Sequence, residues 1–179
     1  TILCNEDLPL LQGQGQYVDD IQLVGTAHVA FVRSPHAHAR ILSVDVTAAR
    51  QMPGVVQIVT GAALHTAVKP IRATLQNPDY RATDWYPLAF DKVRYVGEAV
   101  VAIVAESRYL AEDAIDQVFV EYEPLPVVAN PKIASRPDAP TVHESIPDNV
   151  LLRATVGAKQ QAERFAQAPH RVTACLLYT

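Results

Sequence analysis

The segment from Lys92 to Glu123 constrains the fold more than any other part of the chain. An unbroken apolar run, Ala99 to Ala105, is followed by Glu106 and Ser107. Apolar residues then recur at helical spacing: Leu110, Ala111, Ala114, Ile115 and Val118. The pattern predicts a strand and then a helix, because the Ser107 hydroxyl can accept a hydrogen bond from a free amide of a first helical turn. Beyond the helix the period changes to two, which predicts a second strand that ends at Pro124 and Pro126.

The composition of these two strands predicts where they lie in a sheet. The first strand is apolar on both faces, so it is expected to be central in a sheet that is covered on both sides. The second strand carries Glu121 and Glu123 on one face and is expected nearer water. If the two strands are parallel, the connection between them is expected to be right-handed.

A second unit of the same kind precedes the first. Asp45 or Thr47 can cap a short helix at residues 48–52, Pro53 and Gly54 end it, and residues 55–60 are strand-like. Further strands are expected at 26–33 and 41–46, and one helical turn at 61–64. The predicted fold class is α+β, with two strand-helix-strand halves around a mixed sheet and with extended arms.

Two long segments lack any period. Residues 66–86 are polar and interrupted by prolines, which predicts a long irregular loop that covers a surface or contacts another chain. Tyr80, Trp85 and Tyr86 in this loop are expected at an interface or packed on the parent domain. The proline-rich residues 125–144 predict extended chain around the outside. An amphipathic helix is expected at 158–168, followed by a strand from Arg171 that is cut short.

The composition excludes several classes of protein. The net charge is −4 and the basic residues are scattered singly, so the chain lacks the basic surface that nucleic-acid binding requires. No apolar run approaches the roughly 20 residues of a membrane span, and the first residues do not resemble a signal peptide. Cys4 and Cys175 lie near opposite ends with no metal-binding spacing, which favours a reducing, cytoplasmic compartment over disulfides or zinc.

Three motifs invite a functional interpretation. Gly13 and Gly15 begin a dinucleotide-loop pattern, but its third glycine is replaced by Val18, so a turn is expected instead. Asp19 and Asp20 are neighbours that point to opposite faces of an extended chain, so a shared metal site is not expected.

His36 and His38 place two imidazoles on one strand face. Closed metal sites need further ligands, and only His28, His65, His143 and His170 remain among the histidines. A hydrogen-bonded surface or interface turn is therefore the favoured interpretation, and no residue set forms an active site by spacing alone.

Six blocks of sequence, in this order, resemble a known family: GQGQYVDDI, FVRSPHAHARI, MPGVVQIVTG, LAFDKVRYVGEAVVAIVAES, AEDAIDQVFVEYEPLPVV and FAQAPHRV. They are similar to the amino-terminal a/b hammerhead domain of the molybdenum hydroxylases. This family includes aldehyde oxidase, xanthine dehydrogenase and the large subunit of aerobic carbon monoxide dehydrogenase. The resemblance covers nearly the whole chain and is weak only at residues 66–86 and at the carboxyl end.

The resemblance implies an oxidoreductase with a molybdenum-pterin cofactor, which oxidises an aldehyde, purine, N-heterocycle or carbon monoxide with water as oxygen source. Electrons would leave through iron-sulfur and flavin subunits or domains of an oligomeric enzyme. The residues that contact the cofactor lie in domains that follow the hammerhead, so no catalytic, cofactor-binding or metal-binding residue is expected in this chain. Glu98 and Glu123 are expected to be structural. The alternative is a stand-alone, non-catalytic binding or assembly module.

The two ends of the chain suggest a fragment, because the sequence starts at Thr1 and stops inside an expected strand. Residues 1–170 are expected to form the hammerhead domain, and 171–179 the truncated start of a strand that leads into a molybdenum-binding domain. The last five residues, CLLYT, match what one frame of a common transposon end encodes, so a read-end artefact is a hypothesis for them.

Overall fold

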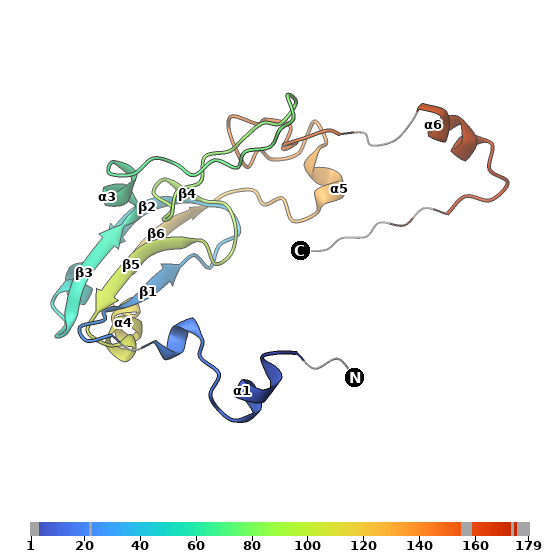
Figure 1. Cartoon of the computed structure of the whole chain (residues 1–179). Helices are drawn as coiled ribbons and strands as arrows, with labels where there is room; N and C mark the ends of the chain where they lie inside the picture. The colour runs from blue at the N-terminus through green and yellow to red at the C-terminus, as the bar shows by residue number, and fades with distance from the viewer. Residues whose placement is uncertain (1–3, 22, 155–158, 173, 175–179) are drawn as a thin grey trace.

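The computed structural model describes residues 4–21, 23–154, 159–172 and 174 (Figure 1). Its helices and strands, in chain order, are α1 (Asp7–Leu11), a 3-10 turn (Val18–Asp20), β1 (His28–Arg33), β2 (Ala39–Asp45), α2 (Thr47–Arg50), β3 (Val55–Thr60), α3 (Gly61–His65), β4 (Lys92–Val93), β5 (Ala99–Ala105), α4 (Arg108–Ile115), β6 (Phe119–Pro124), α5 (Pro131–Ala134) and α6 (Lys159–Ala166). None of these helices has the length and apolar character that a membrane-spanning segment needs.

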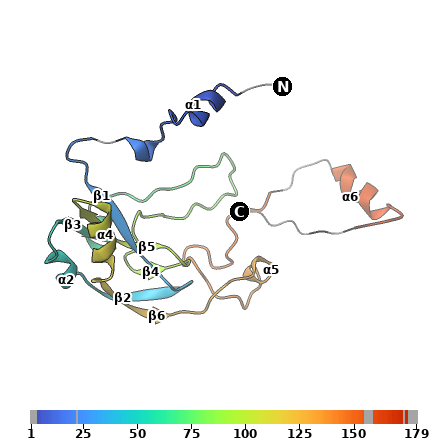
Figure 2. The same ribbon diagram turned by 90° about the horizontal axis from the view of Figure 1, so that it is seen from below.

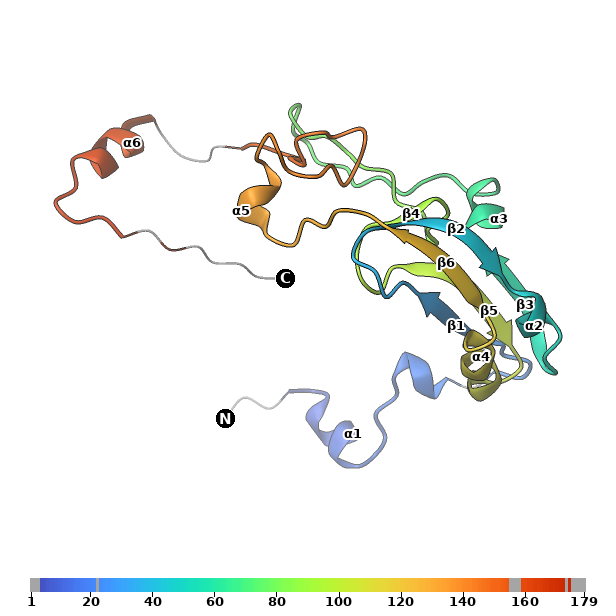
Figure 3. The ribbon, with the colours of Figure 1, turned by 180° about the vertical axis from the view of Figure 1, so that it is seen from behind.

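The strands form two three-stranded sheets, one in the order β1-β5-β3 and the other in the order β4-β2-β6. Every pairing within the two sheets is antiparallel. The α+β class is confirmed. The single mixed sheet was wrong in detail, because each strand pairs with partners far away along the chain, and such long-range pairing leaves no trace in local periodicity. Figure 3, seen from behind, shows β2 and β6 in front of β5 and β1.

Both predicted strand-helix-strand units are present, but each crosses from one sheet to the other. The unit β2-α2-β3 leads from the second sheet into the first, and β5-α4-β6 leads back. Because β5 and β6 lie in different sheets, the rule for parallel crossovers does not apply to them. Ser107 caps α4 as predicted, since its hydroxyl accepts a hydrogen bond from the Leu110 amide at 3.3 Å. The Asp45 carboxylate accepts from the Thr47 amide at 2.9 Å at the start of α2.

The strand β5 is central in its sheet, as predicted. Its inward side chains Val101, Ile103 and Ala105 are fully buried, and they face α4 and the apolar side chains of the second sheet. In Figure 2, seen from below, α4 lies beside β1 and β5. The expectation that β5 is covered on both sides was wrong for the described chain, because Ala102 and Val104, on its other face, keep part of their surface exposed.

The strand β6 lies at the edge of its sheet and exposes its acidic face, as predicted. Glu123 pairs with Arg40 across the strands at 3.2 Å, and Glu121 accepts a hydrogen bond from the Ser43 hydroxyl at 3.1 Å. Charged and hydroxyl side chains in cross-strand pairs are typical of a sheet face in contact with water.

The irregular loop at 66–86 is confirmed and folds back on itself. Ile71 and Trp85 form an isolated antiparallel bridge, and Arg72 makes an ion pair with Asp84. The loop also contacts the chain just beyond the proline-rich segment, because the Arg81 amide donates to the Leu151 carbonyl at 2.9 Å.

The proline-rich segment is compact rather than simply extended. Asn149, at a positive φ of 54°, organises it with its side chain, which accepts from the Val142 amide and donates to the carbonyls of Ala134 and Pro140. A tight turn of this kind favours asparagine because its short side chain can satisfy nearby backbone groups.

At the carboxyl end, the predicted helix is present as α6. The strand expected from Arg171 is absent at residues 171, 172 and 174, and its other residues lie outside the described part of the chain.

Candidate functional site

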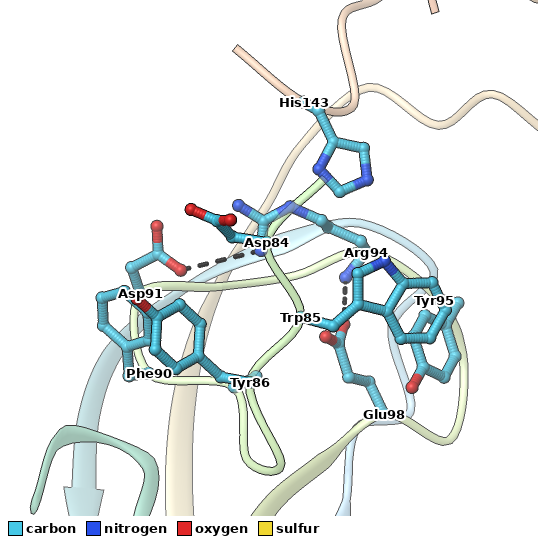
Figure 4. Close-up of a pocket in the computed structure, with 10 residues that line it drawn as sticks. Asp84, Trp85, Tyr86, Phe90, Asp91, Arg94, Tyr95, Glu98 and His143 are labelled. Atoms are coloured by element: carbon cyan, nitrogen blue, oxygen red, sulfur yellow. Dashed lines mark hydrogen bonds and ion pairs between the residues drawn. The ribbon is translucent and has the colours of Figure 1, made fainter. Parts of the chain in front are cut away.

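A small pocket lies where the end of the 66–86 loop, the β4-β5 connection and the proline-rich segment meet (Figure 4). Its volume is about 70 Å³. Aromatic and charged side chains dominate its lining, which consists of Asp84, Trp85, Tyr86, Ala89, Phe90, Asp91, Arg94, Tyr95, Glu98 and His143. A larger, more open depression of about 330 Å³ adjoins it and is lined in addition by Arg72, Ala82, Glu144 and Ser145.

Arg94 links the charged groups of this pocket. Its guanidinium lies 3.7 Å from Asp91 and 4.0 Å from Glu144, and it donates to the Lys92 carbonyl at 3.1 Å. Its backbone amide donates to the Glu98 carboxylate at 2.5 Å. The chain turns back between the two residues at Gly97, whose φ of +88° lies in the left-handed region that glycine adopts easily.

Burial raises the pKa of the Glu98 carboxyl, and the amide and charge of Arg94 only partly oppose this. Desolvation penalises the charged form of an acid, so the folded protein favours protonated Glu98 more than the unfolded chain does. This stabilising contribution is therefore complete below the ordinary pKa of the acid and is lost as the pH rises through the folded value.

The Glu98→Gln variant is accordingly expected to be more stable than the parent at pH 7, by roughly 0.5 kcal/mol, because Glu98 is only half-buried. The glutamine carbonyl can still accept from the Arg94 amide. The difference should disappear below about pH 4, where both side chains are neutral. Thermal unfolding of both proteins between pH 4 and pH 8 measures it, and a destabilised variant at pH 7 would contradict the assignment.

An ion pair between a buried lysine and an exposed glutamate borders the pocket. Lys92 is only 5% exposed and donates to the Glu144 carboxylate at 2.5 Å, which lowers the pKa of Glu144. Burial lowers the pKa of the neighbouring His143, and the positive charges of Arg94 and Lys92 lower it further. His143 is therefore neutral over more of the pH range than a solvated histidine.

Aromatic rings form one wall. His65 stacks on Phe90 with 3.7 Å between ring centroids, and Tyr86 meets both rings edge-on. Tyr86 thus packs on the parent domain, whereas Trp85 is 58% exposed and donates from its indole to the Thr83 hydroxyl at 2.8 Å. Packing on the parent domain is thus confirmed for Tyr86, whereas an interface role for Trp85 stays a prediction.

Glu98 and Glu123, which the sequence marks as structural, bind a backbone amide and a surface arginine, respectively. Glu98 lines the pocket but accepts from a backbone amide, and Glu123 forms an exposed pair with Arg40. The sequence patterns did not reveal Lys92, Arg94, His143 and Glu144 as a group, because nothing in the spacing connects β4 with the proline-rich segment.

The histidine pair is a hydrogen-bonded turn, as predicted, but it is less exposed than expected. His38 is 5% exposed and its Nδ1 lies 2.7 Å from the Pro126 carbonyl, while His36 contacts the Tyr122 ring edge-on. In the described residues, no group of three His, Cys, Asp or Glu side chains comes together as a metal site would.

The remaining motifs lie apart from the pocket. Gly13 belongs to the turn that follows α1, and Gly15 lies in the irregular chain just after it. Asp19 pairs with Arg108 at 2.8 Å, and Asp20 accepts from the Tyr17 amide. Cys4 is exposed, and Cys175 lies outside the described residues.

The fold and the site define the class of this protein. It is an α+β domain of two antiparallel sheets with a small charged pocket. The chain belongs to the aldehyde oxidase and xanthine dehydrogenase family, whose a/b hammerhead domain matches residues 12–126. The resemblance read from the sequence is thereby confirmed.

Relatives and solved structures agree with this assignment. The nicotine 6-hydroxylase large subunit of Paenarthrobacter nicotinovorans is 43% identical over 169 residues, which are 94% of this chain and 21% of that protein. The carbon monoxide dehydrogenase large chain of Afipia carboxidovorans is 44% identical over 145 residues, 81% of this chain and 17% of that protein. The crystal structure of quinoline 2-oxidoreductase from Pseudomonas putida 86 superposes with a TM-score of 0.84 at 39% identity, covering 94% of this chain and 21% of that chain. The chain spans about a fifth of the length of these relatives.

Proposed function

We propose that this chain is the hammerhead part of the large subunit of a molybdenum hydroxylase, in which it supports the cofactor-binding domains and carries no catalytic residue itself. One observation supports this above all: the chain matches its relatives over nearly all of its own length but over only about a fifth of theirs. The complete enzyme would bind molybdenum-pterin in its other domains and pass electrons to iron-sulfur and flavin partners in the cytoplasm. In this proposal residues 1–170 form the hammerhead, and 171–179 begin the connection to the next domain.

The pocket is a poor match for the cofactor. Its volume of about 70 Å³ is far below the roughly 300–1,000 Å³ of a typical small-molecule site. Its guanidinium, that of Arg94, is already engaged by Asp91 and Glu144 and is not free to hold a phosphate group. We therefore assign the pocket a structural role, in which Arg94 and its partners hold the β4-β5 connection against the proline-rich segment.

The reaction remains as broad as the family. The names of the relatives include N-heterocycles, nicotine and quinoline, as well as carbon monoxide. We propose that the complete enzyme oxidises an N-heterocycle, carbon monoxide, an aldehyde or a purine, with water as oxygen source.

Metal analysis separates this proposal from a stand-alone module. The complete polypeptide, purified with its partner subunits, is expected to contain about one molybdenum per large subunit and to support dye-linked oxidation of one of these substrates. The 179-residue chain alone is expected to contain none and to be inactive. Stoichiometric molybdenum in the short chain would overturn the placement of the cofactor, and a complete polypeptide without molybdenum would overturn the proposed function.

A further inference from the structure

The outer face of the sheet β1-β5-β3 is apolar and lacks a cover in the described chain. Its side chains form two cross-strand rows, because residues directly opposite each other in a ladder point to the same side. One row is Val29, Val104 and Gln57, and the other is Phe31, Ala102 and Val59. Five of these six residues are apolar. Val29 is 53% exposed and Phe31 is 40% exposed. No helix or strand lies over this face in Figure 1.

The other sheet of the same chain shows what a water-facing surface looks like here. The outward residues of β2 and β6 pair as Arg40 with Glu123, Ser43 with Glu121 and Asp45 with Phe119, so that only one of these six residues is apolar. A strand that faces water on one side alternates apolar and polar residues, as β6 does, whereas β5 is apolar throughout. The two sheets therefore differ in the environment that their outer faces suit.

The Phe31 ring is held in place at this face. The Arg33 guanidinium lies 5.4 Å from the ring centroid, at the distance of a cation–π contact, and donates to the Gly97 carbonyl at 2.8 Å. Arg33 thus fixes one border of the apolar surface and leaves the ring open outward.

We propose that this face, defined by the two rows, is the surface on which another domain of the same polypeptide packs with apolar side chains. The inference rests on the proposed function, since it requires the polypeptide to be longer than this chain. A separate partner fits poorly, because a stable interface between free proteins takes about 800 Å² and roughly 20–30 residues from each side. Six residues are too few, but a covalently linked domain has a high effective concentration and can cover a small face stably.

Cysteine labelling in the complete polypeptide tests the proposal. Val29→Cys tests the apolar face, and Ser43→Cys is the matched control on the outer face of β2. Both substitutions are small and lie on outward strand positions. Labelling with a water-soluble maleimide, quantified peptide by peptide by mass spectrometry, is expected to be at least tenfold slower in the Val29→Cys variant. Equal rates would overturn the proposal.

A second variant asks whether the cover is apolar. Val104→Lys, combined with Val29→Cys, places an ammonium group in the same row and is expected to raise the labelling rate at residue 29 at least tenfold. Glu121→Lys, on the other sheet, should leave that rate unchanged. Continued protection in the presence of Val104→Lys would overturn the apolar partner.

The molybdenum content of the same preparations distinguishes the two proposals. Stoichiometric molybdenum with equal labelling rates overturns the interface and leaves the proposed function standing. Slow labelling of the Val29→Cys variant in a polypeptide that lacks molybdenum overturns the proposed function and leaves the interface standing.

Discussion

Replacing Gly61 with alanine is expected to lower the free energy of unfolding by about 3 kcal/mol, or to prevent folding altogether. Gly61 is buried at the start of α3, where the backbone of Ala89 and Phe90 crosses it. An added Cβ would lie 2.6 Å from the Ala89 carbonyl carbon and 3.0 Å from the Phe90 Cα, and closer still to the Ala89 oxygen. These are backbone atoms, so no side-chain rotation can relieve the clash.

The crossing segment cannot easily move away. The Ala89 amide donates to the Ala99 carbonyl at 2.8 Å, which ties it to β5 in the centre of the first sheet. The expected loss therefore includes strain in that sheet. Chemical denaturation of the parent and the variant measures the effect.

Gly97→Ala provides the matched control. Gly97 has a φ of +88° but nothing within 4 Å of an added Cβ, so alanine there meets backbone strain without a clash. The expected cost is about 1 kcal/mol. A loss at Gly61 no larger than the loss at Gly97 would show that the two segments separate freely, contrary to the packing described.

Local patterns were sufficient for the elements themselves. The apolar run of β5, the Ser107 cap and the change of period before β6 all act within a few residues, so the sequence predicts each of them correctly. The assignment of β5 and β6 to different sheets depends on pairing with β1, β3 and β2, and no local signal encodes those partners. The same limit explains the outer face of β5, whose apolar residues indicate a cover that the described chain does not contain.

The pocket shows a similar division. The turn between Arg94 and Glu98 is local, and Gly97 marks it in the sequence. The approach of His143 and Glu144 to Lys92 depends on the path of the proline-rich segment, which has no period. The spacing of His36 and His38 likewise does not predict which of the two is buried. That depends on the Pro126 carbonyl, which contacts His38 and lies far away in the sequence.

Replacing Glu144 with glutamine is expected to destabilise the protein by about 2 kcal/mol at pH 7. The change leaves the ammonium of Lys92, whose side chain is 6% exposed, without its anionic partner. Removing one partner of a fully buried pair costs roughly 3–5 kcal/mol. The smaller loss of about 2 kcal/mol is expected here because the Glu144 side chain is 76% exposed. The effect should be measurable by urea denaturation.

The pH dependence of this loss has a definite sign. The hydrogen bond from Lys92 lowers the pKa of Glu144 below its ordinary value near 4.5. Its stabilising contribution is therefore present above that ordinary value and is lost as the pH falls through the lower, folded value. The parent and the Glu144→Gln variant should therefore converge in stability in acid, as the parent and the Glu98→Gln variant do. The two variants differ in sign at pH 7, where Glu144→Gln is expected to be less stable than the parent and Glu98→Gln more stable.

Lys92→Met separates the ion pair from simple packing at this position. Methionine fills a similar apolar volume without a charge to bury, so this variant is expected to stay within about 1 kcal/mol of the parent. On that background Glu144→Gln should cost close to nothing, which gives a coupling energy of about 2 kcal/mol in the double-mutant cycle. An equal cost of Glu144→Gln in both backgrounds would mean that Glu144 acts through Arg94 or through the backbone, and not through the buried lysine. The cycle therefore tests whether one buried charge in β4 fixes the position of the proline-rich segment.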